Sequence, residues 1–153
     1  MAKSTITSTA RDSETSLAIT RRIAASPKDV FDAWTNPESL RLWMRPTGGA
    51  DARVTADVRV GGKYRIDMID GKGKVYEHTG EYLMVDPPRT LKFTWISEGT
   101  EHRASTVTIA LRPVGNETEL TLTHEGLPTA KATDGHRRGW TEILDELEKA
   151  LRR

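Results

Sequence analysis

The chain has 153 residues, with 23 lysines and arginines against 22 aspartates and glutamates, no cysteine, and 36% hydrophobic residues. Such a length fits one domain, which buries roughly 70% of its unfolded surface and can enclose a small-molecule cavity. A net charge of +1 gives no long-range attraction to phosphate, so nucleic acid is not an expected partner. No apolar run approaches the ~18 residues that span a bilayer, so we also expect no membrane.

The missing cysteines exclude disulfides, a thiol nucleophile and cysteine metal sites. Residues 1–15 are rich in serine and threonine and lack the apolar run of a secretory signal, which predicts a flexible tail on a cytoplasmic protein. Residues 16–153 are then expected to form one domain. Its first strand should begin at Leu17, since Leu17, Ile19 and Ile23 share one side of an extended segment that Arg21 interrupts.

Two short helices are predicted next. Ser26-Pro27 places a capping residue before a first-turn proline, and Asn36-Pro37 repeats the arrangement. We therefore expect helices at 27–35 and 37–43.

A long antiparallel meander should follow. Val54, Ala56, Val58 and Val60 alternate with polar residues, and Gly61-Gly62 makes a turn. Further alternation predicts strands near 64–68, 75–85, 91–95, 107–111 and 120–124. Trp140, Leu144, Leu147 and Leu151 then recur at helical spacing, which predicts a helix over 133–151. Strands followed by a segregated helix indicate an α+β domain.

Five segments in this order resemble the START-like helix-grip superfamily (SRPBCC), and within it the stand-alone domains related to the heat-shock-protein-90 ATPase activator (AHSA-like). They are SPKDVFDAWTNPESLRLWMRP (26–46), DVRVGGKYRI (57–66), GEYLMVDPPRTLKFTW (80–95), HEGLP (124–128) and HRRGW (136–140). The resemblance implies a strongly curved antiparallel sheet wrapped around the long C-terminal helix, with two short helices after the first strand. It also implies an elongated apolar cavity between helix and sheet.

Alternation within that fold selects the side chains that could line the cavity. The candidate ligand-binding residues are Trp43, Tyr64, Ile66, Met68, Tyr82, Trp95, His124, His136, Trp140 and Ile143. Several of these residue types also fill ordinary cores, and Trp34 is expected to do only that.

The histidines allow two interpretations. His124 and His136 should lie near each other, where two imidazoles could act as acid and base or bind a metal. No third ligand can be placed beside them, so we expect no metal. Alternatively, they hydrogen-bond to backbone groups around the turn at 126–128. His78 and His102 are expected at the surface.

The leading hypothesis is a non-catalytic carrier or sensor of a small apolar or amphipathic molecule, without cofactor. One alternative is a cyclase- or dehydratase-like enzyme that uses His124 or His136 with a carboxylate. Another, of equal weight, is a co-chaperone-like domain that binds a chaperone in a stress response; the resemblance supports that activity less, because the eukaryotic activator has extra regions beyond the one domain expected here. Relatives often form homodimers, which the sequence neither supports nor excludes.

Overall fold

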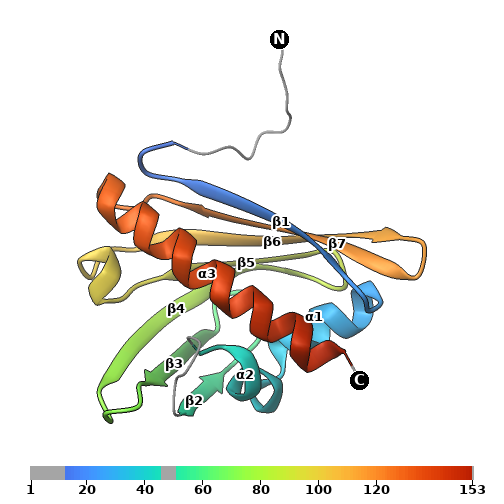
Figure 1. Ribbon diagram of the computed structural model, residues 1–153, viewed down its shortest axis with the longest axis horizontal. Helices are drawn as coiled ribbons and strands as arrows, with labels where there is room; N and C mark the ends of the chain where they lie inside the picture. Colours follow the sequence, from blue (N-terminus) through green and yellow to red (C-terminus); the bar gives the residue numbers. More distant parts are fainter. Residues whose placement is uncertain (1–12, 46–50, 153) are drawn as a thin grey trace.

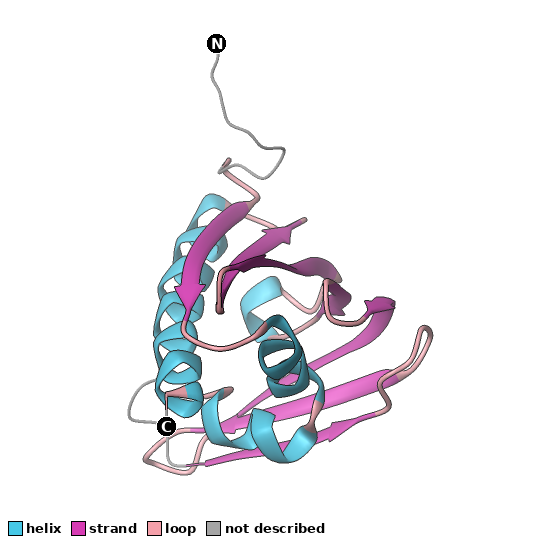
Figure 2. Ribbon diagram, turned by 90° about the vertical axis from the view of Figure 1, so that its right-hand side faces the viewer, coloured by secondary structure: helices cyan, strands magenta, loops and turns pink. Residues whose placement is uncertain are grey.

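The computed structural model describes residues 13–45 and 51–152 (Figure 1). Its elements, in chain order, are β1 (Leu17–Ile23), α1 (Pro27–Thr35), α2 (Pro37–Trp43), β2 (Asp51–Ala56), β3 (Lys63–Ile69), β4 (Val75–Asp86), β5 (Thr90–Trp95), the 3-10 turn η1 (Glu98–Thr100), β6 (Ser105–Val114), β7 (Glu117–Glu125) and α3 (Ala130–Leu151). The strands form one antiparallel sheet in the order β1-β7-β6-β5-β4-β3-β2. This confirms the predicted α+β helix-grip architecture, in which α3 crosses one face of the curved sheet (Figure 2).

Both short helices start where the capping residues predict. The Ser26 hydroxyl accepts a hydrogen bond from the Asp29 amide at 3.2 Å, and the Asn36 side chain accepts one from the Glu38 amide at 2.9 Å. Each cap satisfies an amide that the first helical turn leaves unpaired. The proline after each cap lacks an N–H and so loses nothing there.

The strand predicted to reach Val60 is shorter than expected. β2 ends at Ala56, and Val60 is 63% exposed beyond it. The chain turns instead at 57–62, where the Gly62 amide donates to the Arg59 carbonyl. A Cβ on Gly62 would lie 1.9 Å from the carbonyl oxygen of Asp57, so this turn needs a glycine for close approach.

The sheet bends within β4. The first part of β4 pairs with β3, from Val75 opposite Ile69 to Glu81 opposite Lys63, and the last part pairs with β5. Gly80 lies at this change of partner, where a Cβ would come within 2.0 Å of the Thr94 carbonyl oxygen. Beyond the bend, the end of β3 and the start of β4 face the first half of α3 across the space described below.

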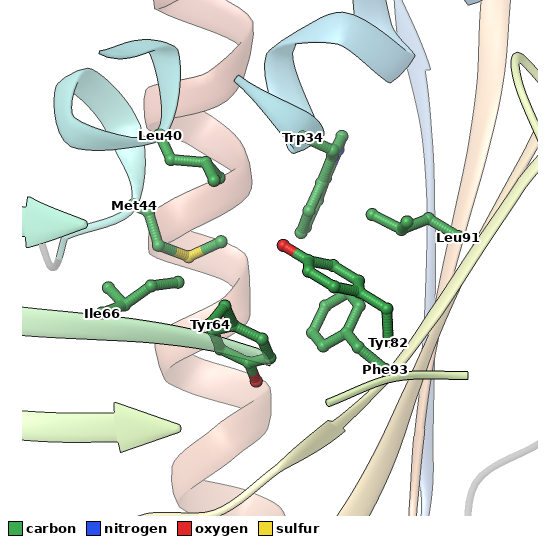
Figure 3. Close-up of a pocket in the computed structure, with 8 residues that line it drawn as sticks. All are labelled: Trp34, Leu40, Met44, Tyr64, Ile66, Tyr82, Leu91 and Phe93. Atoms are coloured by element: carbon green, nitrogen blue, oxygen red, sulfur yellow. The ribbon is translucent and has the colours of Figure 1, made fainter. Parts of the chain in front are cut away.

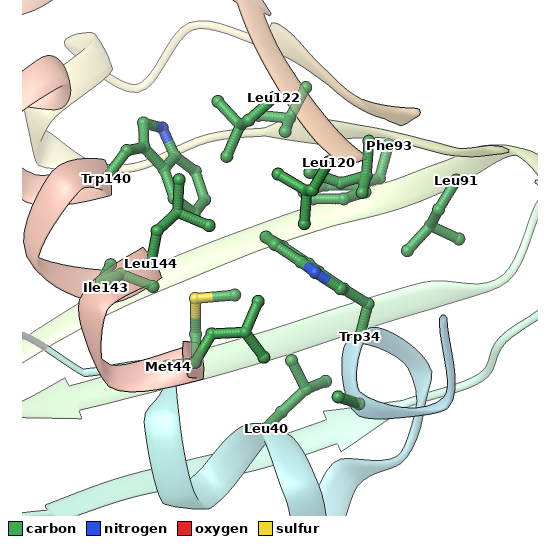
Figure 4. Packing of buried hydrophobic residues seen from close by; sticks show 14 of the residues in the cluster. Trp34, Leu40, Met44, Leu91, Phe93, Leu120, Leu122, Trp140, Ile143 and Leu144 are labelled. Atoms are coloured by element: carbon green, nitrogen blue, oxygen red, sulfur yellow. The ribbon is translucent and has the colours of Figure 1, made fainter. Parts of the chain in front are cut away.

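The core lies between α3, the two short helices and the inner face of the sheet (Figure 4). Trp140, Leu144 and Leu147 form the buried stripe of α3, as the spacing predicted, and Trp34 packs among them from α1. Arg21, which interrupted the apolar pattern of β1, pairs with Asp145 at 2.9 Å and with Glu148 on α3. An arginine on the inner face is therefore explained by acidic partners on the helix above it.

Part of the predicted N-terminal tail lies outside the described residues, namely residues 1–12. The three residues that follow contact the domain. The Thr15 carbonyl accepts a hydrogen bond from the Leu127 amide at 3.0 Å, and the Glu14 carbonyl accepts one from the Thr133 hydroxyl at 2.7 Å. Residues 14 and 15 are thus joined to the domain by hydrogen bonds.

Candidate functional site

A groove runs between the first half of α3 and the ends of β3, β4 and β5, beside η1. It consists of two adjoining hollows of about 300 and 510 Å³, which share Met68, His78, Gly99 and His136. The other residues that line it are Asp70, Tyr76, Glu77, Trp95, Ser97, Glu98, Ala132, Gly135, Gly139, Trp140 and Ile143. We call this the α3 groove; its volume is in the range of sites for small organic molecules.

Glycines make room for the groove. On α3, a Cβ at Gly135 or Gly139 would meet nothing within 4 Å. A glycine inside a helix lowers the stability of the helix by about 1 kcal/mol relative to alanine. No steric clash requires glycine at 135 or 139, since a Cβ there would meet no neighbouring atom. Gly99 lies opposite in η1, where a Cβ would come within 3.1 Å of Cε1 of His136.

Next to Gly99, the Nε2 nitrogen of His136 carries no proton and can accept a hydrogen bond. Its Nδ1 lies 2.8 Å from the carbonyl oxygen of Ala132, one turn back in α3. A carbonyl only accepts, so Nδ1 carries the proton and, in the neutral ring, Nε2 is an acceptor. Burial lowers the pKa of His136, which the bond to Ala132 partly opposes, so the ring is neutral at pH 7. Within the described part of the chain, Nε2 has no hydrogen-bond partner.

His78 lies on the opposite wall, contrary to its predicted surface position. It is half-buried, and its ring packs on Trp95 with the ring centroids 4.7 Å apart. Burial lowers the pKa of His78 to about 4. Among the described residues, its Nδ1 and the indole nitrogen of Trp95 are buried without a hydrogen-bond partner. An unsatisfied buried polar group costs about 1–3 kcal/mol, which a polar ligand atom could recover.

His124 belongs to the core beneath the groove. Its side chain is fully buried, and Nδ1 accepts a hydrogen bond from the Trp140 indole at 3.0 Å. Its Nε2 lies 2.7 Å from the hydroxyl of Ser105, which in turn donates to the Trp95 carbonyl. Nε2 must therefore carry the proton, and both ring nitrogens are used. Burial lowers the pKa of His124 to about 3, so the ring is neutral at pH 7. Because Nδ1 accepts from Trp140 and Nε2 donates to Ser105, the ring offers no free lone pair to a substrate proton or a metal.

Neither histidine bonds to the turn at 126–128. The partners of His124 are side chains from β6 and α3, and the backbone partner of His136 lies in its own helix. Instead, His124 accepts a hydrogen bond from the indole of Trp140, which forms part of the groove lining.

A second, much smaller cavity lies at the other end of the inner face (Figure 3). Its volume is about 10 Å³, room for about one water molecule, so no organic ligand fits in this conformation. Figure 3 shows the Tyr82 hydroxyl pointing between Trp34, Leu40 and Met44. Burial raises the pKa of Tyr82 to about 12, so the hydroxyl stays protonated.

The outer part of the groove is acidic. Its described lining includes Asp70, Glu77 and Glu98 but neither lysine nor arginine. Glu77 pairs with Arg65 at 2.7 Å, and the backbone amides of Lys72 and Lys74 donate to the Asp70 carboxylate, which lowers its pKa.

The structure divides the candidate residues into three sets. The groove takes Met68, Trp95, His136, Trp140 and Ile143; the small cavity takes Tyr64, Ile66 and Tyr82; the packed core takes Trp43 and His124. Trp43 is fully buried, and its indole donates to the Ala33 carbonyl. His78 was missed, although its period-two relation to Tyr82 places both on the inner face.

The described residues contain no group of three or more histidine, aspartate or glutamate side chains that could hold a metal ion. None of the helices over 13–45 and 51–152 is long and apolar enough to cross a membrane.

Comparisons with known proteins agree with this architecture. Protein CV1439 from Chromobacterium violaceum has 24% identity and a TM-score of 0.81, covering 91% of this chain and 98% of its own. The AHSA1 protein SPO3351 from Silicibacter pomeroyi has 28% identity and a TM-score of 0.76, covering 89% and 96%. No curated protein sequence matches. The profile of the family described as "Activator of Hsp90 ATPase homolog 1-like protein" matches residues 24–152. The chain therefore belongs to the AHSA1-like family of the START-like (SRPBCC) superfamily.

Proposed function

We propose that this protein is a small-molecule-binding module that holds its ligand in the α3 groove, as a carrier or sensor. Three features of the groove support this: its volume of about 300 and 510 Å³ in two hollows, its lining by Met68, Trp95, Trp140 and Ile143, and its neutral histidines. Apolar lining supplies affinity, since each 100 Å² of apolar surface removed from water contributes about 2.5 kcal/mol. A few polar atoms then set orientation.

The observation that carries the proposal is the open space over Gly135 and Gly139. Nothing lies within 4 Å of a Cβ at either position, although both glycines are in the middle of a long helix on the inner face of the fold. Helices that pack on a sheet normally fill such positions with side chains, because interiors are close-packed. A ligand would occupy the volume that these side chains leave.

Native mass spectrometry of the freshly purified protein, compared with Gly139→Leu and Arg138→Leu, tests the proposal. Leucine at 139 projects into the groove, whereas the adjacent position 138 is exposed, which makes Arg138→Leu the matched control. We expect a non-covalent adduct, or stabilisation by a panel of small aromatics and lipids, in the wild type and Arg138→Leu but not in Gly139→Leu. Equal behaviour of all three proteins would contradict it. The same spectra report monomer or dimer.

Acid–base catalysis is the second candidate, and the bare Nε2 of His136 favours it. Such a nitrogen, in a ring whose Nδ1–H donates to a backbone carbonyl, has the arrangement of a general base. It ranks second because burial lowers the pKa of the ring and weakens it as a base. The test is whether the wild type converts the ligand found by mass spectrometry while His136→Gln binds that ligand without converting it.

A further inference from the structure

We infer that the α3 groove selects an uncharged aromatic molecule that carries a hydroxyl or N–H donor for Nε2 of His136, and that it rejects anionic amphiphiles such as fatty acids. The inference rests on the proposed function and narrows the ligand class. Three features of the groove lead to it: its aromatic surfaces, the uncharged acceptor Nε2 of His136, and its charge.

The aromatic surfaces come from rings that contact one another. The Trp95 ring lies 4.7 Å from the His78 ring and 4.9 Å from the Trp140 ring, measured between centroids. The hydrogen bond from Trp140 to His124 holds the Trp140 indole in place. A rigid set of aromatic faces favours a flat ring, which stacks or packs edge-to-face on them, over a flexible alkyl chain.

The acceptor is set by the tautomer of His136. Because Nδ1 donates to the Ala132 carbonyl, Nε2 can only accept while the ring is neutral. The Cε1–Nε2 edge faces Gly99, at 3.1 and 3.5 Å from the position of a Cβ there. The absence of a side chain at Gly99 leaves this edge of His136 uncovered, so a ligand donor can approach it.

The charge of the groove disfavours anions. The charged groups that line the described part of the groove are the carboxylates of Asp70, Glu77 and Glu98, and the two histidines there are neutral. Two cations that contact lining residues are already engaged, since Arg65 pairs with Glu77 at 2.7 Å and the Lys74 ammonium lies 4.8 Å over the Tyr76 ring. A carboxylate ligand would lose water without gaining a positive partner.

Three probes that share one ring system test this: 2-naphthol, 2-methylnaphthalene and naphthalene-2-carboxylate, each titrated calorimetrically at pH 7.5. We expect 2-naphthol to bind two- to tenfold more tightly than 2-methylnaphthalene, the range for one neutral hydrogen bond. The carboxylate should bind at least tenfold more weakly than 2-naphthol.

Variants locate the effect. In His136→Phe, which keeps a ring but removes the acceptor, the advantage of 2-naphthol over 2-methylnaphthalene should disappear, and His136→Gln should restore part of it. Gly99→Ala should weaken 2-naphthol, while Gly71→Ala, whose Cβ meets nothing within 4 Å, should not.

The outcomes separate the two claims. Tightest binding by the carboxylate, or a 2-naphthol preference unchanged in His136→Phe, would overturn the inference but leave binding in the groove intact. Absence of binding by every probe, or binding that Gly139→Leu does not reduce, would overturn the proposed function as well.

Discussion

The indole of Trp140 on α3 donates a hydrogen bond to Nδ1 of His124 on β7, with 3.0 Å between the two nitrogens. This bond joins the helix to the sheet beneath it at the floor of the α3 groove. It forces the proton of His124 onto Nε2, which continues the chain through Ser105 to the Trp95 carbonyl. Trp140 through its indole and Trp95 through its backbone carbonyl are thus connected to one buried histidine.

Removing that histidine should destabilise the fold. In His124→Leu, the Trp140 indole and the Ser105 hydroxyl lose their buried partner, so we expect the free energy of unfolding to fall by about 2–4 kcal/mol. Urea denaturation measures this. His102→Asn, at an exposed position with a φ of 58° that asparagine tolerates, should change stability by less than about 0.5 kcal/mol. Equal effects at the two positions would contradict a structural role for His124.

Stability should decrease as the pH falls from 7 towards 4. The pKa of His78 is lowered to about 4 and that of His124 to about 3, from an ordinary 6.5, so the unfolded chain binds protons in this window that the folded chain does not. Each histidine then lowers the free energy of unfolding by about 1.4 kcal/mol per pH unit. Urea denaturation at several pH values should give a slope that is smaller by this amount in His124→Gln. An unchanged slope would show that His124 titrates normally.

Replacing glycine by alanine should lower the stability of the protein at the bend in β4 and raise it in α3. In Gly80→Ala, the Cβ would lie 2.0 Å from the Thr94 carbonyl oxygen and 2.5 Å from the Tyr64 ring, so a loss of about 3 kcal/mol or more is expected. Gly135→Ala meets no atom within 4 Å and should stabilise α3 by about 0.5–1 kcal/mol. Thermal unfolding distinguishes them; a tolerated Gly80→Ala would show that the bend can relax.

The ion pairs of Arg21 should contribute modestly and depend on salt. Arg21 is half-buried between Asp145 and Glu148, and Arg21→Met keeps its packing while removing the charge. We expect a loss of about 1 kcal/mol at low ionic strength that shrinks in 1 M NaCl. A double-mutant cycle with Glu148→Gln measures the pair; a coupling of zero would mean that only the packing of Arg21 matters.

Local chemistry explains why much of the fold was predictable. The caps at Ser26 and Asn36 fixed both short helices to the residue, and the four-three-four spacing of Trp140 to Leu151 identified α3. Alternation failed at Val58 and Val60, because the chain turns at 57–62, where Gly62 permits a close approach to the Asp57 carbonyl.

The site was predictable only in part. Alternation identifies the inner face, so Met68, Trp95 and Trp140 were expected near a ligand. It does not show which inward side chains pack against one another, and this is why Trp43 and His124 lie in the core. The groove itself depends on the absence of side chains at Gly99, Gly135 and Gly139. The sequence shows the glycines but does not show which space in the fold they leave open.

The most direct test of groove binding is a ¹H–¹⁵N titration of the indole N–H signals with 2-naphthol. The chain has four tryptophans, and each gives one indole signal. The indole of Trp95 lines the groove without a hydrogen-bond partner among the described residues, whereas that of Trp43 donates to the Ala33 carbonyl inside the core. We predict that the signals of Trp95 and Trp140 shift on titration while that of Trp43 does not. Shifts confined to Trp43, or an unchanged spectrum at saturating probe, would contradict binding in the α3 groove.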